Sequence, residues 1–343
     1  MSKRKLSNLQ KSRIQSIQQL RKQRAKDGHS PTVQTVDNLD DLGPEISGTV
    51  VSNFGAQADI EANEGDLTGK ITRCHMRSNL DPLVTGDKVI WRFGEPYGVV
   101  VARIDRYSEL MRPDTYGKLR PVAANIDVIA IVFSSKPTAF SNLIDRYLVA
   151  AEAQNIQPIL ILNKTDLGTE HKFLNIDQLV HDYKSIGYNV LSVSAKTGDG
   201  FESLQDYLFN KTAIFVGQSG VGKSSLVNRL QPQANAVVGS LSIGKEKGTH
   251  TTTVSRLFHF AHGGILIDSP GIREFSLTHL SQEQVINSFI DFRPHLGRCK
   301  FRDCLHKSEP GCSLLDAINQ KKILQSRFDN YHQIIMSQEL ERR

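Results

Sequence analysis

The hydrophobic and polar positions divide the chain into regions of different pattern. Between residues 46 and 106, five short runs rich in β-branched and apolar residues are separated by glycines, which predicts short strands joined by turns. This pattern indicates a small closed barrel of the OB type over residues 46–110. Such barrels often bind RNA, although a β-domain without an RNA contact has the same pattern. Trp91, Phe93 and Tyr97 either form a surface that stacks on bases or belong to the core.

From residue 126 onwards, continuous apolar runs alternate with amphipathic segments. The run at 126–134 is apolar almost throughout, as expected of a strand buried on both faces of a parallel sheet. A helical pattern follows at 141–155, with Ser141 as its expected N-cap. The alternation continues to a strand at 212–217, and it predicts an α/β domain with a mostly parallel sheet over residues 111–275.

Residues 276–343 are polar and helical, and they are predicted to form a separate C-terminal domain. An amphipathic helix is expected at its end, with Leu315, Ile318, Phe328 and Ile335 on the apolar face. No apolar run of the chain approaches the roughly 20 residues that cross a bilayer, so an integral membrane protein is excluded.

The net charge of +6 is concentrated at the N-terminus of the 343-residue chain. Residues 1–26 contain nine Lys and Arg and no acidic residue, whereas the rest carries slightly more acidic than basic residues. This favours an arm that contacts a phosphate backbone, although a solubilising tail or an organelle transit peptide has a similar composition. Residues 27–45 are polar with Gly and Pro, so residues 1–45 are predicted to be a basic disordered arm and linker.

A phosphate-binding motif follows the strand at 212–217, in the pattern G-x4-G-K-[ST], and a helical pattern follows the motif. The glycines allow successive N–H groups to surround an anion, and the helix N-terminus adds a positive end. Lys223 would reach the β- and γ-phosphates, and the Ser224 hydroxyl would bind Mg²⁺. The candidate nucleotide-binding residues are Gly217, Gln218, Ser219, Gly220, Val221, Gly222, Lys223, Ser224 and Ser225.

Two motifs indicate that the nucleotide is guanine-based. Residues 163–166 read N-K-T-D at the end of an apolar strand, and the carboxylate of such a motif accepts hydrogen bonds from the N1–H and 2-amino group of guanine, which adenine lacks. The Asn either bonds the base or supports the phosphate loop, and the Lys stem covers the base. The next strand ends in S-A-K at 194–196, which matches the loop whose backbone N–H contacts guanine O6. The candidates are Asn163, Lys164, Thr165, Asp166, Ser194, Ala195 and Lys196.

Two further segments complete the predicted site. A strand ends in D-x-x-G, in which Asp268 lies on the Mg²⁺ side and the Gly271 N–H senses the γ-phosphate. Residues 247–253 contain three threonines, and Thr252 is expected to complete the Mg²⁺ shell together with Ser224.

The expected catalytic machinery has a gap. Many GTPases have a Gln after D-x-x-G that orients water, but here the residue is Ile272, which predicts slow intrinsic hydrolysis. His250 is the candidate that positions or deprotonates water; the alternative is a surface histidine without a role in catalysis.

Four cysteines are too few for a disulfide-stapled secreted scaffold, and three of them lie close together. Cys299, Cys304, His306 and Cys312 have a spacing that satisfies a tetrahedral Zn²⁺ without an open position, which predicts one structural zinc ion. Free thiols without metal are the alternative. Cys74 is remote and is expected to be an inert core thiol.

The guanine motifs precede the phosphate loop and its switch segments, which is the reverse of the order in Ras-like GTPases. A circular permutation explains this order, because the termini of compact domains often lie close together. The segment after 268–271 then leads directly into the C-terminal domain, so nucleotide state is expected to move that domain.

A barrel, a permuted GTPase domain and a Cys3His module in this order resemble the bacterial ribosome small-subunit-dependent GTPase A family over residues 46–335. The resemblance implies an OB-fold, a permuted GTPase core with Mg²⁺ and GTP, and a zinc domain. It places the catalytic histidine on His250, within G-T-H-T-T-T at 248–253, and the zinc ligands on the four Cys and His residues named above.

The resemblance also implies a cytoplasmic protein that binds the small (30S) ribosomal subunit and its rRNA. It implies assistance in late maturation of the subunit, GTP hydrolysis to GDP that is slow alone and faster on the subunit, and release of ribosome-binding factor A. We expect a monomer without membrane association. The alternatives are a GTP-regulated signalling or translation factor with a protein partner, and a structural RNA-binding zinc protein with a vestigial nucleotide site.

Overall fold

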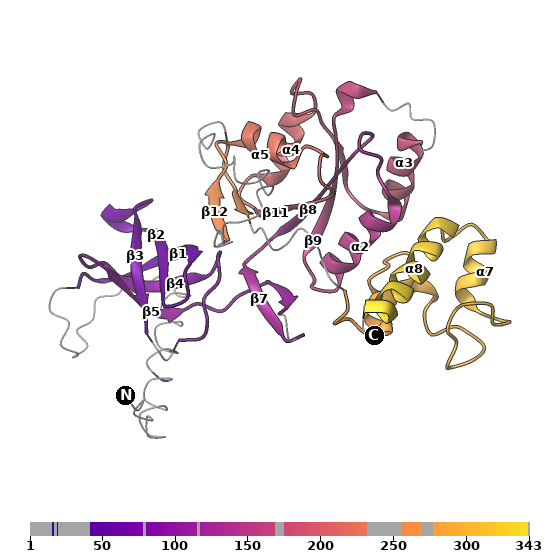
Figure 1. Ribbon diagram of the computed structural model, residues 1–343, viewed down its shortest axis with the longest axis horizontal. Coiled ribbons are helices and arrows are strands. Elements are labelled where there is room, and N and C mark those ends of the chain that lie inside the picture. Colours follow the sequence, from indigo (N-terminus) through magenta and orange to yellow (C-terminus); the bar gives the residue numbers. More distant parts are fainter. Residues whose placement is uncertain are drawn as a thin grey trace. The chain divides into compact units, whose positions relative to one another are not determined.

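The computed structural model describes residues 42–77, 80–114, 117–168, 175–231, 255–268 and 277–341, and the helical positions Ser16 and Gln19 (Figure 1). The predicted site residues His250, Thr252 and Gly271 lie outside these ranges, as does most of the predicted basic arm. The chain forms two compact units. The first comprises Met1–Leu110, Pro121–Asn125 and Thr252–Phe258, and the second comprises Met111–Arg120, Ile126–Thr251 and His259–Arg343.

The first unit contains the predicted five-stranded barrel. β1 pairs with β2 and β4, β2 with β3, and β5 with β3 and β4, so the sheet closes on itself. Only the β3–β5 pair of the barrel is parallel, and this closed order is that of the OB-fold, as predicted. The strands are β1 (Glu45–Asn53), β2 (Gln57–Ala62), β3 (Ile71–Met76), β4 (Lys88–Arg92) and β5 (Gly98–Arg103), with the 3-10 turn η1 (Gly65–Leu67) between β2 and β3. β12 (Arg256–His259) pairs with β1 through Arg256 and Ser52.

The barrel core forms around Trp91. Its side chain is fully buried, so Trp91 belongs to the core and is not available to stack on bases. Tyr97, in contrast, is 43% exposed. A Cβ at Gly48 would lie 2.6 Å from the indole nitrogen of Trp91, so the indole fills space that only a glycine leaves open. The Cys74 thiol is also fully buried, and burial raises its pKa to about 12, which confirms an inert core thiol.

The second unit contains a parallel sheet in the order β10-β9-β8-β11-β13, and it confirms the predicted α/β architecture. Every residue of β8 is buried, which explains why its sequence is apolar without alternation. The strands are β8 (Val128–Ser134), β9 (Gln157–Asn163), β10 (Val190–Ser192), β11 (Thr212–Val216) and β13 (Ile265–Asp268). The helices between them are α2 (Ser141–Glu152), α3 (Ile176–Ile186), α4 (Phe201–Leu208) and α5 (Lys223–Leu230), with the 3-10 turn η2 (Thr165–Leu167) after β9.

The helix ends differ in how well local signals mark them. α3 begins after Asn175, whose side chain accepts the N–H of Gln178, and ends at Gly187 with a left-handed φ of 111°. The expected N-cap of α2 was Ser141, but the structure places Phe140 at that position and Ser141 inside the helix. The Ser141 hydroxyl instead accepts a hydrogen bond from the Asn330 amide, which lies far along the chain.

The C-terminal residues form helices that share a core with α2. The single amphipathic helix that was expected at the end is two helices, α7 and α8, and α8 packs on α2 (Figure 1). Val149 and Ala150 of α2 belong to the same buried cluster as Phe289, Phe292 and Tyr331. The elements of this C-terminal region are α6 (Gln282–Asn287), the 3-10 turn η6 (Arg293–His295), α7 (Ser313–Asn319) and α8 (Gln325–Glu341). Elsewhere in the chain, a hairpin of β6 (Glu109–Pro113) and β7 (Leu119–Ala124) precedes β8. None of the helices in the described ranges combines the length and apolar character that crossing a bilayer requires.

Candidate functional site

The order of the parallel sheet reverses between β8 and β11. β8, β9 and β10 follow one another in one direction, whereas β11 and β13 continue in the other. Open α/β sheets bind their ligands at such a point, beyond the carboxyl ends of the strands. Gly217 leaves β11 there, and a Cβ on it would lie 2.1 Å from the carbonyl oxygen of Val132 in β8. The sheet therefore requires glycine at the start of the predicted phosphate loop.

The predicted phosphate loop is a tight turn that leads into α5. Gly217, Gly220 and Gly222 have φ angles of 138°, 84° and 94°, which glycine adopts without the strain that other residues incur. The Lys223 ammonium donates hydrogen bonds to the carbonyl oxygens of Gly217 at 2.6 Å and Gln218 at 2.7 Å. The positive charge thus lies within the curve of the loop, where a phosphate group would approach it. Ser219 and Ser225 are exposed, and Ser224 is half-buried in the first turn of α5.

Asn163 joins the first guanine motif to this loop. Its side-chain amide donates to the carbonyl oxygen of Val221 at 2.9 Å, and its carbonyl oxygen accepts the N–H of Ala195 at 3.1 Å. Lys164 makes a second connection, because its ammonium donates to the carbonyl oxygen of Gly220 at 2.6 Å. Asn163 and Val221 are 58 positions apart in the chain, so only the fold brings them together. This contact is the one expected if Asn163 supports the phosphate loop.

The two guanine motifs also contact each other. The Ser194 hydroxyl donates to the Asp166 carboxylate at 2.7 Å, and it accepts the N–H of Thr197 at 3.1 Å. The N–H of Thr165 bonds the carbonyl oxygen of Val193 at 3.2 Å, so the two strand ends are linked through the backbone as well. The motifs that follow β9 and β10 therefore form one surface beside the phosphate loop.

Asp268 is the last residue of β13, the strand that pairs with β11. This places its carboxylate at the same edge of the sheet as the phosphate loop. His250, Thr252 and Gly271 lie outside the described residues, and their roles remain predictions.

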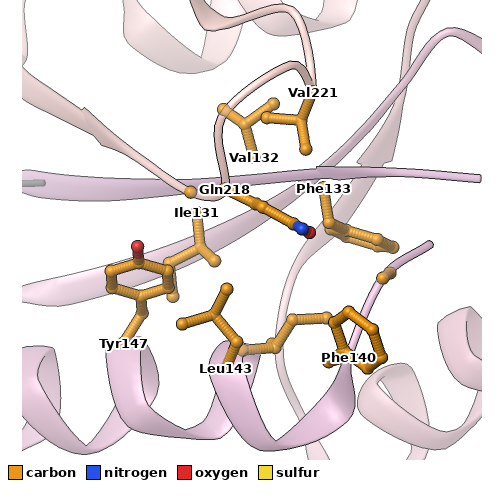
Figure 2. Close-up of a pocket in the computed structure, with 11 residues that line it drawn as sticks. Ile131, Val132, Phe133, Phe140, Leu143, Tyr147, Gln218 and Val221 are labelled. Atoms are coloured by element: carbon orange, nitrogen blue, oxygen red, sulfur yellow. The ribbon is translucent and has the colours of Figure 1, made fainter. Parts of the chain in front are cut away.

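A pocket lies next to the start of the phosphate loop, between β8 and α2 (Figure 2). It is lined mainly by apolar side chains, among them Phe133, Leu143 and Tyr147, and Gln218 extends across it. Apart from the amide of Gln218 and the hydroxyl of Tyr147, its labelled side chains are apolar, and none of them carries the positive charge that favours a phosphate. We therefore assign the pocket to the packing below the loop, with which it shares Gly217, Gln218 and Val221.

The predicted zinc ligands converge in the C-terminal region. Their sulfur and nitrogen atoms all lie within 4.8 Å of one another, and Nδ1 is the nitrogen of His306 that faces the thiols. It lies 3.3 Å from the sulfur of Cys312, 3.5 Å from that of Cys299 and 3.6 Å from that of Cys304. Burial lowers the pKa of His306, which favours the neutral imidazole that binds metals. This donor set fits one structural Zn²⁺.

Two residues that the spacing did not single out support this cluster. The Glu309 carboxylate accepts the backbone N–H groups of Leu305, Lys307 and Ser308 at 2.9, 2.7 and 3.0 Å. The hydrogen bond to its own backbone N–H, together with these three, lowers the pKa of Glu309 to about 2. The Ser313 hydroxyl lies 3.2 Å from the sulfur of Cys299 and donates to the carbonyl oxygen of His295. In the sequence, Glu309 and Ser313 are marked only by their position between or beside the predicted ligands. That position alone does not identify a supporting residue.

A parallel sheet with a phosphate loop at its switch point, joined to guanine motifs that come earlier in the chain, defines a circularly permuted GTPase. Comparison with known proteins agrees with this class. The family model "RsgA GTPase" matches residues 103–278, which is about half of the chain.

Relatives match over nearly the whole chain. "Small ribosomal subunit biogenesis GTPase RsgA" of Pseudomonas syringae pv. syringae (strain B728a) is 52% identical over 338 residues, which cover 98% of each chain. Among solved structures, YjeQ from Thermotoga maritima is 30% identical with a TM-score of 0.70, over 86% of this chain and 98% of that one. YloQ, described as a circularly permuted GTPase, is 28% identical with a TM-score of 0.68, over 90% and 99%. The chain belongs to the RsgA GTPase family, and it is a hydrolase acting on GTP.

Proposed function

We propose that this GTPase acts in the biogenesis of the small ribosomal subunit, and that it binds GTP between the two guanine motifs and the phosphate loop. The observation that carries the binding proposal is the contact of Asn163 with Val221, which joins the guanine motif to the phosphate loop. The 52% identical relative, named for small ribosomal subunit biogenesis, supports the cellular role.

Each part of the surface has a role that follows from its chemistry. The Asp166 carboxylate accepts hydrogen bonds from the guanine N1–H and 2-amino group, and the loop at 194–196 contacts O6 through a backbone N–H. Lys223 and the N–H groups of residues 217–225 bind the phosphates. Ser224 and Thr252 would hold Mg²⁺ on the side of Asp268, where a bound ion would supply positive charge to the phosphates, and the Gly271 N–H would sense the γ-phosphate.

Hydrolysis depends on a group that orients the attacking water. Ile272 cannot do this through its side chain, so we propose that the isolated protein hydrolyses GTP slowly and that His250 orients or deprotonates water. Binding of the small subunit then accelerates the reaction. A His250→Ala variant should bind GTP normally and lose the acceleration; an unchanged rate on the subunit would remove His250 from the mechanism.

The remaining parts fit an RNA-bound partner. We propose that the barrel (46–110), the GTPase domain (111–275) and the zinc domain (276–343) act as one cytoplasmic monomer. The Cys3His cluster would hold one zinc ion, which would stabilise the C-terminal helices without a part in hydrolysis. The basic arm at 1–26 contacts rRNA, and GTP hydrolysis accompanies release of ribosome-binding factor A.

The deciding experiment measures nucleotide specificity and turnover together. The unmodified protein should hydrolyse GTP slowly, and purified small subunits should raise the rate. Asp166→Asn should transfer this activity from GTP to xanthosine triphosphate, because the amide complements the 2-oxo group of xanthine. Asp199→Asn is the matched control. Among the contacts described, the Asp199 carboxylate accepts a hydrogen bond only from the nearby Thr197 hydroxyl, so the variant should still hydrolyse GTP. GTP turnover that Asp166→Asn leaves unchanged would contradict the binding proposal, and no response to small subunits would contradict the cellular role.

A further inference from the structure

Arg229 connects the phosphate-loop helix to the second guanine motif. It lies near the end of α5, the helix that begins with Lys223, and its guanidinium reaches the loop that follows β10. One nitrogen, Nη1, donates to the carbonyl oxygens of Ala195 at 3.1 Å and Lys196 at 3.3 Å. Hydrogen bonds from a charged donor to carbonyl oxygens are stronger than those between neutral groups, so this contact constrains the loop.

The surroundings of Arg229 leave a defined place for its guanidinium. A Cβ at Gly198 would lie 2.2 Å from Nη2 of Arg229, and Gly198 has a left-handed φ of 98°. The guanidinium also lies 5.2 Å from the ring centre of Phe201, the first residue of α4, where an aromatic ring attracts a cation. The absence of a side chain at Gly198 therefore allows the arginine to reach both carbonyl groups.

The held carbonyls determine where the neighbouring N–H groups point. Because a trans peptide unit is planar, its N–H points opposite to its carbonyl oxygen. Fixing the carbonyl of Ala195 therefore directs the N–H of Lys196 away from Arg229. In the same way, the N–H that follows the carbonyl of Lys196 belongs to Thr197, and it bonds the hydroxyl of Ser194, which itself holds Asp166.

We propose that Arg229 is a positioning residue for guanine recognition, which orients the peptide units of the 194–196 loop so that a backbone N–H faces the O6 atom of the base. This inference rests on the proposed GTP site and adds a determinant of base specificity that lies outside the guanine motifs. A purely structural arginine would stabilise the fold without changing how the site distinguishes atoms at position 6 of the base.

The test compares two ligands that differ at this atom. The dissociation constants of GDP and 6-thioguanosine diphosphate are measured by calorimetry for the unmodified protein and for Arg229→Ala. The sulfur analogue keeps the N1–H and the 2-amino group and has a weaker acceptor at position 6. We expect Arg229→Ala to weaken GDP binding by about fivefold to tenfold, the range for losing a charged hydrogen-bond donor at an exposed site. The dissociation constant of the sulfur analogue should change by less than about twofold. The ratio of the two dissociation constants, which measures the preference for GDP, should therefore fall.

Two further variants make the result specific. Lys184→Ala removes an exposed cation from the last turn of α3 and should leave both dissociation constants unchanged. Arg229→Lys keeps the positive charge but has a single donor group, so its preference for GDP should lie between those of the unmodified protein and Arg229→Ala. This variant also provides the measurement if the alanine variant does not fold. Equal weakening of both ligands, or no change in either, would overturn the inference. If the unmodified protein bound neither nucleotide, the proposed function itself would be wrong, and this inference with it.

Discussion

Gly222 meets two separate requirements at the end of the phosphate loop. Its φ of 94° lies in the left-handed region, and a Cβ on it would lie 2.4 Å from the side-chain nitrogen of Asn163. The same position thus accommodates both the turn into α5 and the contact between the guanine motif and the loop. A substitution here changes backbone strain and the geometry of the site together.

We expect Gly222→Ala to weaken GDP binding by more than about tenfold, because the methyl group displaces Asn163 and distorts the turn. Gly187→Ala is the matched control, since Gly187 also has a left-handed φ but has nothing within 4 Å of its added Cβ. Both variants should lose about 1 kcal/mol of unfolding free energy from the backbone alone. Calorimetry measures the loss of GDP binding, and urea unfolding measures the loss of unfolding free energy. Equal loss of GDP binding in both variants would contradict this account.

Cys74 is expected to make the stability of the barrel fall at alkaline pH. Burial raises the pKa of its thiol from 9.0 to about 12, so the unfolded chain releases this proton at lower pH than the folded chain. The contribution is therefore complete below pH 9 and decreases as the pH rises towards 12, by up to about 1.4 kcal/mol per pH unit.

A Cys74→Ala variant tests this because it lacks the titrating group. It should be less stable than the unmodified protein near pH 7, and the difference should shrink above pH 9. Unfolding is followed by the fluorescence of Trp91, the single tryptophan of the chain, which lies in the barrel core. Parallel stability curves for the two proteins between pH 8 and 11 would show that the thiol does not contribute.

At the scale of elements, a buried polar network fastens α8 to α2. Arg327 of α8 donates to Asp145 of α2 at 2.5 Å and to Asp291 at 2.8 Å, and Asn330 and Tyr183 donate to Asp145 at 2.7 Å each. Burial acts to lower the pKa of Arg327, but the two carboxylates outweigh it and hold this pKa well above its usual value. A nucleotide-driven movement of the C-terminal helices relative to α2, as expected from the sequence, would have to disrupt this network and the shared core.

Arg327→Met should lower the unfolding free energy by about 3–5 kcal/mol, because it leaves two carboxylates buried without their cation. The matched control is Arg293→Met: Arg293 is about half exposed, and the change removes its ion pair with Glu152 of α2 and its hydrogen bond to the carbonyl oxygen of Asn287, each at 2.7 Å. That change should cost at most about 1 kcal/mol. Urea unfolding monitored by circular dichroism provides the comparison, and similar losses in the two variants would argue against a buried network.

At the scale of the whole molecule, the Cys3His cluster and the GTPase sheet belong to one unit, whereas the barrel belongs to the other. Cys312 is buried in the cluster that contains Val149 and Ala150 of α2. A change at the metal site therefore reaches the helix that packs on β8 and β9. We expect the consequences of metal loss to extend beyond the ligand loop.

Removal of the proposed zinc ion by a chelator should lower the thermal midpoint of the second unit, because metal binding contributes directly to folding. The transition followed by circular dichroism at 222 nm (the usual helix wavelength) should shift down, while the transition followed by Trp91 fluorescence should stay in place. A Cys299→Ser variant should have this lower thermal midpoint even without chelator, and chelator should not lower it further. A shift of both signals together would show that the two units do not respond separately to the metal.

Much of the fold follows from local pattern. The continuous apolar run of β8 and the glycine-separated runs of the barrel predicted strands where the structure has them, because burial on one or both faces leaves a periodic trace in the sequence. The turn at the predicted phosphate loop was predictable for a different reason: its glycines, Lys223 and the following helix are contiguous in the sequence. Ser141 shows the limit of local signals: its type suggested an N-cap, but a contact with Asn330 in α8 uses its hydroxyl.

The sequence by itself determined which segments are candidates for the chemistry: the guanine motifs, the phosphate-loop motif and the four predicted zinc ligands each lie in a short contiguous segment. The tertiary structure alone decided how these segments meet. The contact of Asn163 with Val221 spans 58 positions, and that of Asp145 with Arg327 spans 182. Such contacts depend on how helices pack on the sheet and leave no periodic trace in the chain, so only folded coordinates reveal that Arg229 supports the guanine loop and that the C-terminal helices share a core with α2.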